Sequence, residues 1–166
     1  MKLLSSISII ITFIAATAFI TGPSSTIPSA EVNTLDGKTV NIKDYIGQGK
    51  ITVVSFWATW CGPCKKELDA IAKVYPAWQE KYNVELIAIT IDEARSLARV
   101  PALIEKKGWD YTVLADVNQE LKEALKFQTI PQTFLLDQKG EIIYSHNSYN
   151  PGDELELEEK ISALVK

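Results

Sequence analysis

Two cysteines separated by a glycine and a proline are the residues of this chain best suited to chemistry. Cys61 and Cys64 are the only cysteines among its 166 residues. A disulfide between them closes a very short loop, and so short a loop constrains the unfolded chain little. The pair is therefore a poor structural staple, and its spacing favours a disulfide that opens and closes during a reaction.

The predicted helix after the cysteines gives the two sulfurs different roles. A helix that starts at Cys61 would stabilise its thiolate through free N–H groups and the positive end of the helix dipole. Cys61 is then the nucleophile that attacks a substrate disulfide, and Cys64, one helical turn away, resolves the mixed disulfide. A plain structural disulfide remains the alternative. A metal site would need more ligands than two cysteines and the distant His146, which is expected at the surface, at a strand end and without a partner.

The dithiol is expected at the junction between a buried strand and a helix. Residues 51–57 are β-branched and aromatic and form a run short enough for a strand, whereas residues 65–81 are compatible with a helix. Pro76 predicts a kink or a short break in that helix. Lys65 and Lys66 at its start are expected to form a solvated face.

Strand and helix signals alternate along the rest of the chain. Strands are predicted at 32–35, 39–42, 84–91, 111–115, 133–137 and 141–144, and helices at 93–107, 119–126 and 153–165. Asp36-Gly37 marks a hairpin turn between the first two strands. Pro101 disturbs the first of the helices and Gly108 closes it, while Asn118 is the expected N-cap of the second. These elements predict an α/β fold in which helices flank a mixed central sheet.

The beginning of the chain has the pattern of an export signal. Lys2 precedes 18 uncharged, largely apolar residues at 3–20, followed by a Gly/Pro/Ser/Thr-rich stretch. That length lies between the apolar region of a typical signal peptide and a membrane-spanning helix. We therefore predict a cleaved signal peptide or a retained N-terminal membrane anchor at 1–22, a linker at 23–30 and one domain at 31–166. The net charge of −4 and the lack of a basic cluster argue against a nucleic-acid partner.

Two segments carry a family resemblance. SFWATWCGPCKKE at 55–67 and IPQTFLLD at 130–137 resemble the active-site segment and the cis-proline segment of thioredoxins, and most closely their extracytoplasmic TlpA/ResA-type relatives. The resemblance implies a thioredoxin-like fold with an N-terminal β-hairpin extension. It also implies that Pro131 is cis and lies against the dithiol, and that the backbone of Ile130 pairs with a bound substrate strand. Trp60, Gly62 and Pro63 would then contact the substrate as well.

The resemblance also contains a departure. Cytoplasmic-type thioredoxins have a buried aspartate where this chain has Ser55, and a serine cannot replace a titrating carboxylate. ResA-type proteins have a glutamate three residues after the second cysteine, and Glu67 occupies that position. Because Cys64 and Glu67 can share one helix face, we predict that Glu67 is the acid/base group that accepts the Cys64 proton. A solvated first-turn glutamate is the alternative.

The expected function is that of a thiol-disulfide oxidoreductase that reduces disulfides in exported proteins, with apocytochrome c as one candidate substrate. Such an extracytoplasmic enzyme would need a membrane thiol reductase as its electron donor. It is expected to be a monomer without cofactor or metal. Peroxide reduction fits poorly, because Thr59 lies two residues before Cys61 where peroxiredoxins have threonine three before. A non-enzymatic metal-handling or binding module on the same fold is a further alternative.

Overall fold

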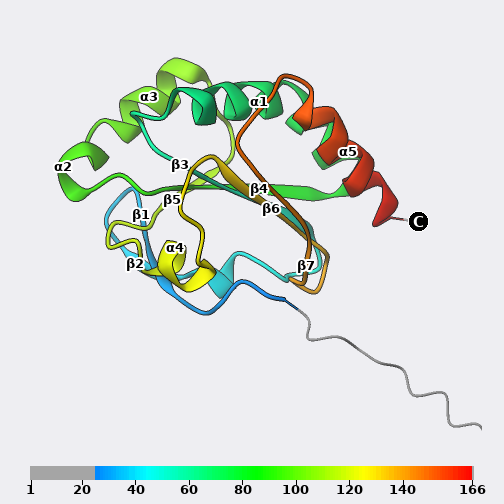
Figure 1. The fold of residues 1–166 in the computed structure, drawn as a ribbon, viewed down its shortest axis with the longest axis horizontal. Helices are drawn as coiled ribbons and strands as arrows, with labels where there is room; N and C mark the ends of the chain where they lie inside the picture. Colours follow the sequence, from blue (N-terminus) through cyan, green and yellow to red (C-terminus); the bar gives the residue numbers. More distant parts are fainter. Residues whose placement is uncertain (1–24, 166) are drawn as a thin grey trace, which may run out of the picture.

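A mixed seven-stranded sheet forms the centre of the protein (Figure 1). The computed structural model describes residues 25–165, so the leader predicted at 1–22 lies outside the described residues. The strands run in the order β2-β1-β5-β4-β3-β6-β7, with β3, β4 and β5 parallel to one another and the remaining pairs antiparallel. Their bounds are β1 Glu31–Thr34, β2 Thr39–Asn41, β3 Ile51–Trp57, β4 Val84–Thr90, β5 Thr112–Ala115, β6 Gln132–Leu136 and β7 Ile142–Asn147.

Helices cover both faces of this sheet. Figure 1 shows α1, α3 and α5 along one face and α4 on the other. The bounds are α1 Gly62–Tyr82, α2 Ala94–Leu97, α3 Val100–Lys107, α4 Glu120–Leu125 and α5 Asp153–Ala163, with a short 3-10 helix at Ile42–Asp44. Within residues 25–165, no helix has the length and apolar character needed to cross a membrane. The predicted α/β fold with a mixed sheet is confirmed.

The central strand β3 is buried along its whole length, which explains its continuous apolar run. Val53 packs in one cluster with Ile71 of α1 and Leu157 of α5. Val54 and Phe56 belong to the other cluster. Because successive side chains of a strand point to opposite faces, Ser55 shares the face of Val53, on the side of α1.

The predicted hairpin at the N-terminal edge is confirmed. β1 and β2 pair antiparallel, and Gly37 in the turn has a φ of 87°, a conformation that glycine adopts without steric cost. Part of the segment predicted as a linker also packs on the fold. Ile27 is fully buried, and Thr26 forms an isolated bridge with Glu141.

The structure corrects the prediction of a break at Pro76. Helix α1 runs without interruption from Gly62 to Tyr82 and includes Pro76. The ring of Pro76 is exposed, while its neighbours Tyr75 and Trp78 are buried. Their packing holds the helix together across a residue that lacks an N–H donor.

Two other helix predictions need correction. The segment predicted as one helix at 93–107 divides into α2 and α3, with Pro101 in the first turn of α3, where its missing N–H costs nothing. Asn118 is not the cap of α4, which follows Gln119 in a left-handed conformation. The Asp116 carboxylate accepts hydrogen bonds from the N–H groups of Leu121 and Lys122 instead.

Candidate active site

The two cysteines form a disulfide at the first turn of α1. Their Cα atoms are 5.4 Å apart, Cys61 is 5% exposed and Cys64 is fully buried. Cys61 is the N-cap of the helix, and the N–H of Cys64 points at the Cys61 Sγ at 3.2 Å. The strand-to-helix placement is therefore confirmed. The helix start provides N–H groups and a positive dipole end at the sulfur of the less buried cysteine.

The predicted cis-proline lies next to this disulfide. The Ile130-Pro131 peptide bond is cis, as predicted, and Pro131 is buried. The Ile130 carbonyl oxygen is 3.9 Å from the Cys61 Sγ. The chain ahead of β6 thus meets the dithiol although it lies 69 residues further along the sequence. Pairing of the Ile130 backbone with a substrate strand stays a prediction.

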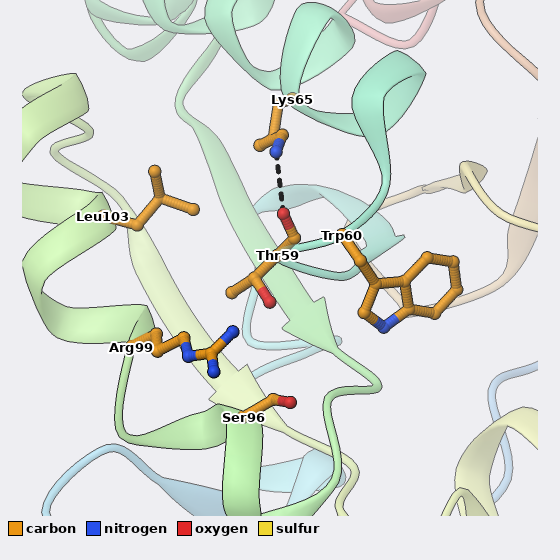
Figure 2. Close-up of a pocket in the computed structure, with 6 residues that line it drawn as sticks. All are labelled: Thr59, Trp60, Lys65, Ser96, Arg99 and Leu103. Carbon is orange, nitrogen blue, oxygen red and sulfur yellow. Dashed lines mark hydrogen bonds between the residues drawn. The ribbon is translucent and has the colours of Figure 1, made fainter.

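Trp60, Gly62 and Pro63 form the exposed surface around the disulfide. Trp60 is 67% exposed, and Gly62 and Pro63 are exposed as well. Two grooves of about 300 Å³ each meet at the Trp60 ring. One groove is lined by Thr59, Lys65, Ser96, Arg99 and Leu103 (Figure 2), and the other by Ile91, Gln119, Lys122, Gln128, Thr129 and Ile130. Trp60, Gly62 and Pro63 are therefore accessible to a partner, and their contact with substrate stays a prediction.

The loop that carries Trp60 is held by a residue that the sequence analysis missed. Asp92 is fully buried and accepts hydrogen bonds from the Thr59 backbone N–H at 2.7 Å, from the Thr59 hydroxyl at 2.7 Å and from the Thr90 hydroxyl at 2.6 Å. Lys65 donates to the Thr59 carbonyl oxygen at 2.7 Å (Figure 2). The prediction of a solvated face is confirmed for Lys66, which is exposed. It needs correction for Lys65, which is only partly exposed and whose ammonium binds the loop.

A signal for Asp92 exists in the sequence. It directly follows a predicted strand, and parallel neighbouring strands end at one edge of a sheet, where functional groups gather. The strand that leads into Cys61 is that neighbour, since β3 and β4 pair in parallel. The Thr59 hydroxyl donates its hydrogen bond to Asp92. It is therefore not an unpaired hydroxyl beside Cys61.

Glu67 lies at the centre of a buried polar cluster, which we call the Glu67 cluster. Its members are Glu67, Ser55, Thr133 and His146. Glu67 is 1% exposed, so the alternative of a solvated glutamate is wrong. One carboxylate oxygen, Oε1, accepts from the Thr133 hydroxyl at 2.9 Å and lies 2.7 Å from the His146 Nε2, and Oε2 accepts from the Ser55 hydroxyl at 3.2 Å. Glu67 and the fully buried Cys64 are three residues apart on α1.

The position of His146 contradicts its prediction as a partnerless surface histidine. β7 continues beyond the predicted end at 144 to Asn147, and its side chains alternate between partly buried and exposed. Thr133 on β6 is the register partner of both Ser55 on β3 and His146 on β7. The three side chains therefore form one row across three strands, and Glu67 of α1 meets that row from above the sheet.

The electrostatics of His146 follow from this arrangement. Burial lowers the pKa of the imidazole, but the hydrogen bond and the negative charge of Glu67 outweigh burial, and Asp153 and Glu156 add to them. The net effect raises the pKa of His146 above its ordinary value. The pair therefore favours a protonated imidazole beside a carboxylate. The sequence signal for the buried side of His146 is the alternation of side chains along a strand. It places residues 142, 144 and 146 on the covered face of β7.

The chemistry that these groups can perform is dithiol-disulfide exchange. Of the two cysteines, Cys61 keeps a small exposure and Cys64 is fully buried, and the buried carboxylate of Glu67 with its hydrogen-bonding partners follows on the same helix. Among residues 25–165, no cluster of three or more His, Cys, Asp or Glu side chains is arranged to hold a metal ion.

Comparison with known proteins gives consistent matches. Residues 23–145 match the AhpC/TSA family. The chain is 33% identical over 116 residues to the thiol-disulfide oxidoreductase ResA of Bacillus thuringiensis strain Al Hakam. This match covers 70% of this chain and 64% of that protein. It is 31% identical over 129 residues to ResA of a second Bacillus thuringiensis strain, 97-27, with 78% and 72% covered.

A solved structure agrees with these matches. An uncharacterized thioredoxin-like protein from Porphyromonas gingivalis superimposes with a TM-score of 0.75 at 40% identity. The superposition covers 84% of this chain and 91% of that protein. The likeness therefore extends over most of the chain and is not confined to the segment around the cysteines.

Proposed function

Because the chain belongs to the AhpC/TSA family and has a thioredoxin-like fold, we propose that it is a thiol-disulfide oxidoreductase that reduces disulfides in exported proteins through Cys61 and Cys64. One observation carries the proposal. The disulfide closes at the N-terminus of α1, where Cys61 is 5% exposed and Cys64 is fully buried, and the cis Pro131 segment lies beside it. A structural staple would need neither the helix N-terminus at its first sulfur nor the adjoining grooves.

The reaction consists of two exchanges that start from the reduced protein. The Cys61 thiolate attacks one sulfur of the substrate disulfide, that S–S bond breaks, and the other substrate sulfur leaves as a thiolate that takes a proton from solvent. Cys64 then attacks the Cys61 Sγ, the mixed disulfide breaks, and the second substrate thiol leaves. Two electrons pass to the substrate, and the Cys61–Cys64 disulfide forms.

Glu67 is proposed as the base of the second exchange. Cys64 is buried and must lose its proton before it can attack, and a group with access to that proton speeds the step. Glu67 is one helical turn away on the buried side of α1. Its carboxylate is ionisable and is already oriented by three hydrogen-bonding side chains.

The surface around the dithiol is proposed as the substrate contact. Trp60, Gly62 and Pro63 would meet the substrate from one side, and the Ile130-Pro131 segment from the other. The groove between Trp60 and Ile130 offers apolar side chains beside amide groups and a lysine, which suits an extended polypeptide. Within the described residues, no acidic side chain lines this groove or the one beside Arg99.

The cellular setting is part of the proposal. The leader at 1–22, as a signal peptide or an anchor, and the linker that follows would deliver a monomeric domain outside the cytoplasm. There a membrane thiol reductase would return it to the dithiol form. Gly62-Pro63 between the cysteines resembles reductants more than oxidants, and apocytochrome c is one candidate substrate.

A redox titration tests the proposal. The full chain, purified in mild detergent, is equilibrated in thiol-disulfide buffers and followed by tryptophan fluorescence, for which the exposed Trp60 beside the disulfide is a local probe. We expect a reversible two-electron transition near or below about −230 mV. A value near about −120 mV would assign an oxidant instead. Cys61→Ala gives the fluorescence baseline of a protein that cannot form the disulfide. If the wild type showed no reversible transition relative to this baseline, the assignment as an oxidoreductase would be refuted.

A further inference from the structure

The chain contains a single histidine, and the fold places it against the buried carboxylate of Glu67, three residues after Cys64 on α1. His146 and Glu67 are 79 residues apart in sequence, yet Nε2 and Oε1 are separated by 2.7 Å. The side chains are 14% and 2% exposed, respectively. The contact is the product of two strand pairings, β3 with β6 and β6 with β7, and of helix α1. The exchange steps described above give His146 no role beyond its hydrogen bond to Glu67.

The surroundings of the pair are mostly neutral on the sheet side. Ser55 and Thr133 donate hydroxyl hydrogen bonds to Glu67 and carry no charge. The titratable or charged side chains that face the pair are Cys64 on α1, Tyr111 ahead of β5, Tyr144 on β7, Tyr149 after it, and Asp153, Glu156 and Lys160 at α5. Lys160 lies over the Tyr144 ring and pairs with Glu156. His146 is thus the only cationic group in this set that touches the carboxylate.

This geometry places one cationic side chain and two neutral hydroxyl donors on the buried carboxylate of Glu67. A buried carboxylate without a counter-charge binds its proton more tightly, because burial penalises the charged form. Neutral hydroxyl donors offset part of that penalty, and an imidazolium in direct contact offsets more of it. Glu67 can act as a base for Cys64 only while it is ionised.

We propose that His146 is a positioning residue for this reaction: in contact with Glu67, it keeps the buried carboxylate ionised and oriented so that Glu67 can take the proton of Cys64. The inference rests on the proposed function of Glu67. In the step concerned, the Cys64 S–H proton goes to Glu67, a bond forms between the Cys64 and Cys61 sulfurs, and the substrate sulfur leaves Cys61 with the bonding electron pair.

The single histidine allows a direct test by NMR. The imidazole resonances of the untagged full chain can belong only to His146, so its pKa is read from a pH titration without assignment. We expect a value above about 6.5 in the wild type and a value lower by about one pH unit or more in Glu67→Gln. An equal pKa in the two proteins would overturn the ion pair.

A kinetic test separates this inference from the proposed function. Reduced protein reacts with dithionitrobenzoate, and thionitrobenzoate is released once when Cys61 attacks and again when Cys64 resolves the mixed disulfide. In the wild type we expect the rate of the second release to fall as the pH decreases, which gives the pH–rate profile an acid limb. In His146→Gln that limb should move up by about one pH unit, which is roughly a tenfold slower second release on the limb. In Glu67→Gln the limb should disappear, and adding His146→Gln to Glu67→Gln should change nothing more.

Control variants distinguish a failure of this inference from a failure of the proposed function. Ser55→Ala removes a neutral donor from Oε2 but keeps the ion pair, so it should move the limb less than His146→Gln does. A limb that does not move in His146→Gln, in a protein whose far-UV circular dichroism is native, would overturn the inference and leave the exchange reaction intact. If the wild type released no thionitrobenzoate in either step, the oxidoreductase proposal itself would fail.

Discussion

The substitution Asp92→Asn tests whether the active-site loop depends on one buried carboxylate. Asp92 accepts three hydrogen bonds of 2.6 to 2.7 Å, two from Thr59 and one from Thr90. An asparagine has one acceptor oxygen instead of two and no charge, so at least one of these donors would face an NH₂ group. Loss of a charge-assisted hydrogen bond at a buried site costs roughly 1.5 to 3 kcal/mol, and an unpaired buried donor adds to it.

We therefore expect Asp92→Asn to lower the free energy of unfolding by about 2 to 4 kcal/mol. With a denaturant slope of roughly 2 kcal/mol per M, the middle of the usual range in urea, the urea midpoint should fall by roughly 1 to 2 M, measured by circular dichroism. Asp69→Asn is the matched control, because that carboxylate is partly exposed and pairs with Lys107 and Trp109. It should cost less than about 1 kcal/mol. Equal costs for the two substitutions would refute the reasoning.

Four further outcomes are expected. Cys64→Ser should accumulate the mixed disulfide of Cys61 with a substrate, detected by mass spectrometry, and rapid turnover would contradict the assignment of the resolving sulfur. Trp60→Ala should lower kcat/KM for a protein disulfide by about tenfold, or about 1.4 kcal/mol, and change the reaction with dithionitrobenzoate far less. Folding raises the pKa of His146, so the stability that its ion pair adds to the fold is complete below the unfolded pKa of about 6.5 and is lost as the pH rises through the folded pKa. The difference in the free energy of unfolding between wild type and His146→Gln should therefore shrink as the pH rises. Reduced protein dialysed against buffer should retain well under one equivalent of Cu(I) or Zn(II), and retention of a full equivalent would favour the metal-handling alternative.

The helix interruptions show where local signals fall short. Pro76 and Pro101 give the same local signal against a continuous helix, yet α1 continues through Pro76, whereas Pro101 lies in the first turn of α3. The difference is tertiary, because Tyr75 and Trp78 are anchored in the core on either side of Pro76. Asn118 has the intrinsic preference for an N-cap, but Asp116, folded back from the end of β5, holds the N–H groups that a cap would bind.

The sequence by itself determined the parts of this protein that depend on neighbouring residues. It specified the Cys-Gly-Pro-Cys pair between a buried strand and a helix, the Asp36-Gly37 hairpin, and the resemblance that implied a cis Pro131. Strand and helix periodicity, turn residues and cysteine spacing are local properties, so no knowledge of the fold is needed to read them. The same holds for the predicted position of Glu67 one turn after Cys64.

Only the tertiary structure decided what surrounds these residues. Ser55, Thr133 and His146 come from three strands and form a row beneath Glu67 because the register of β3, β6 and β7 aligns them. Asp92 reaches Thr59 because β3 and β4 end together at one edge of the sheet. Such contacts follow from which strands pair and in which register, and that choice is made by the burial of the whole core and not by any short segment of the chain.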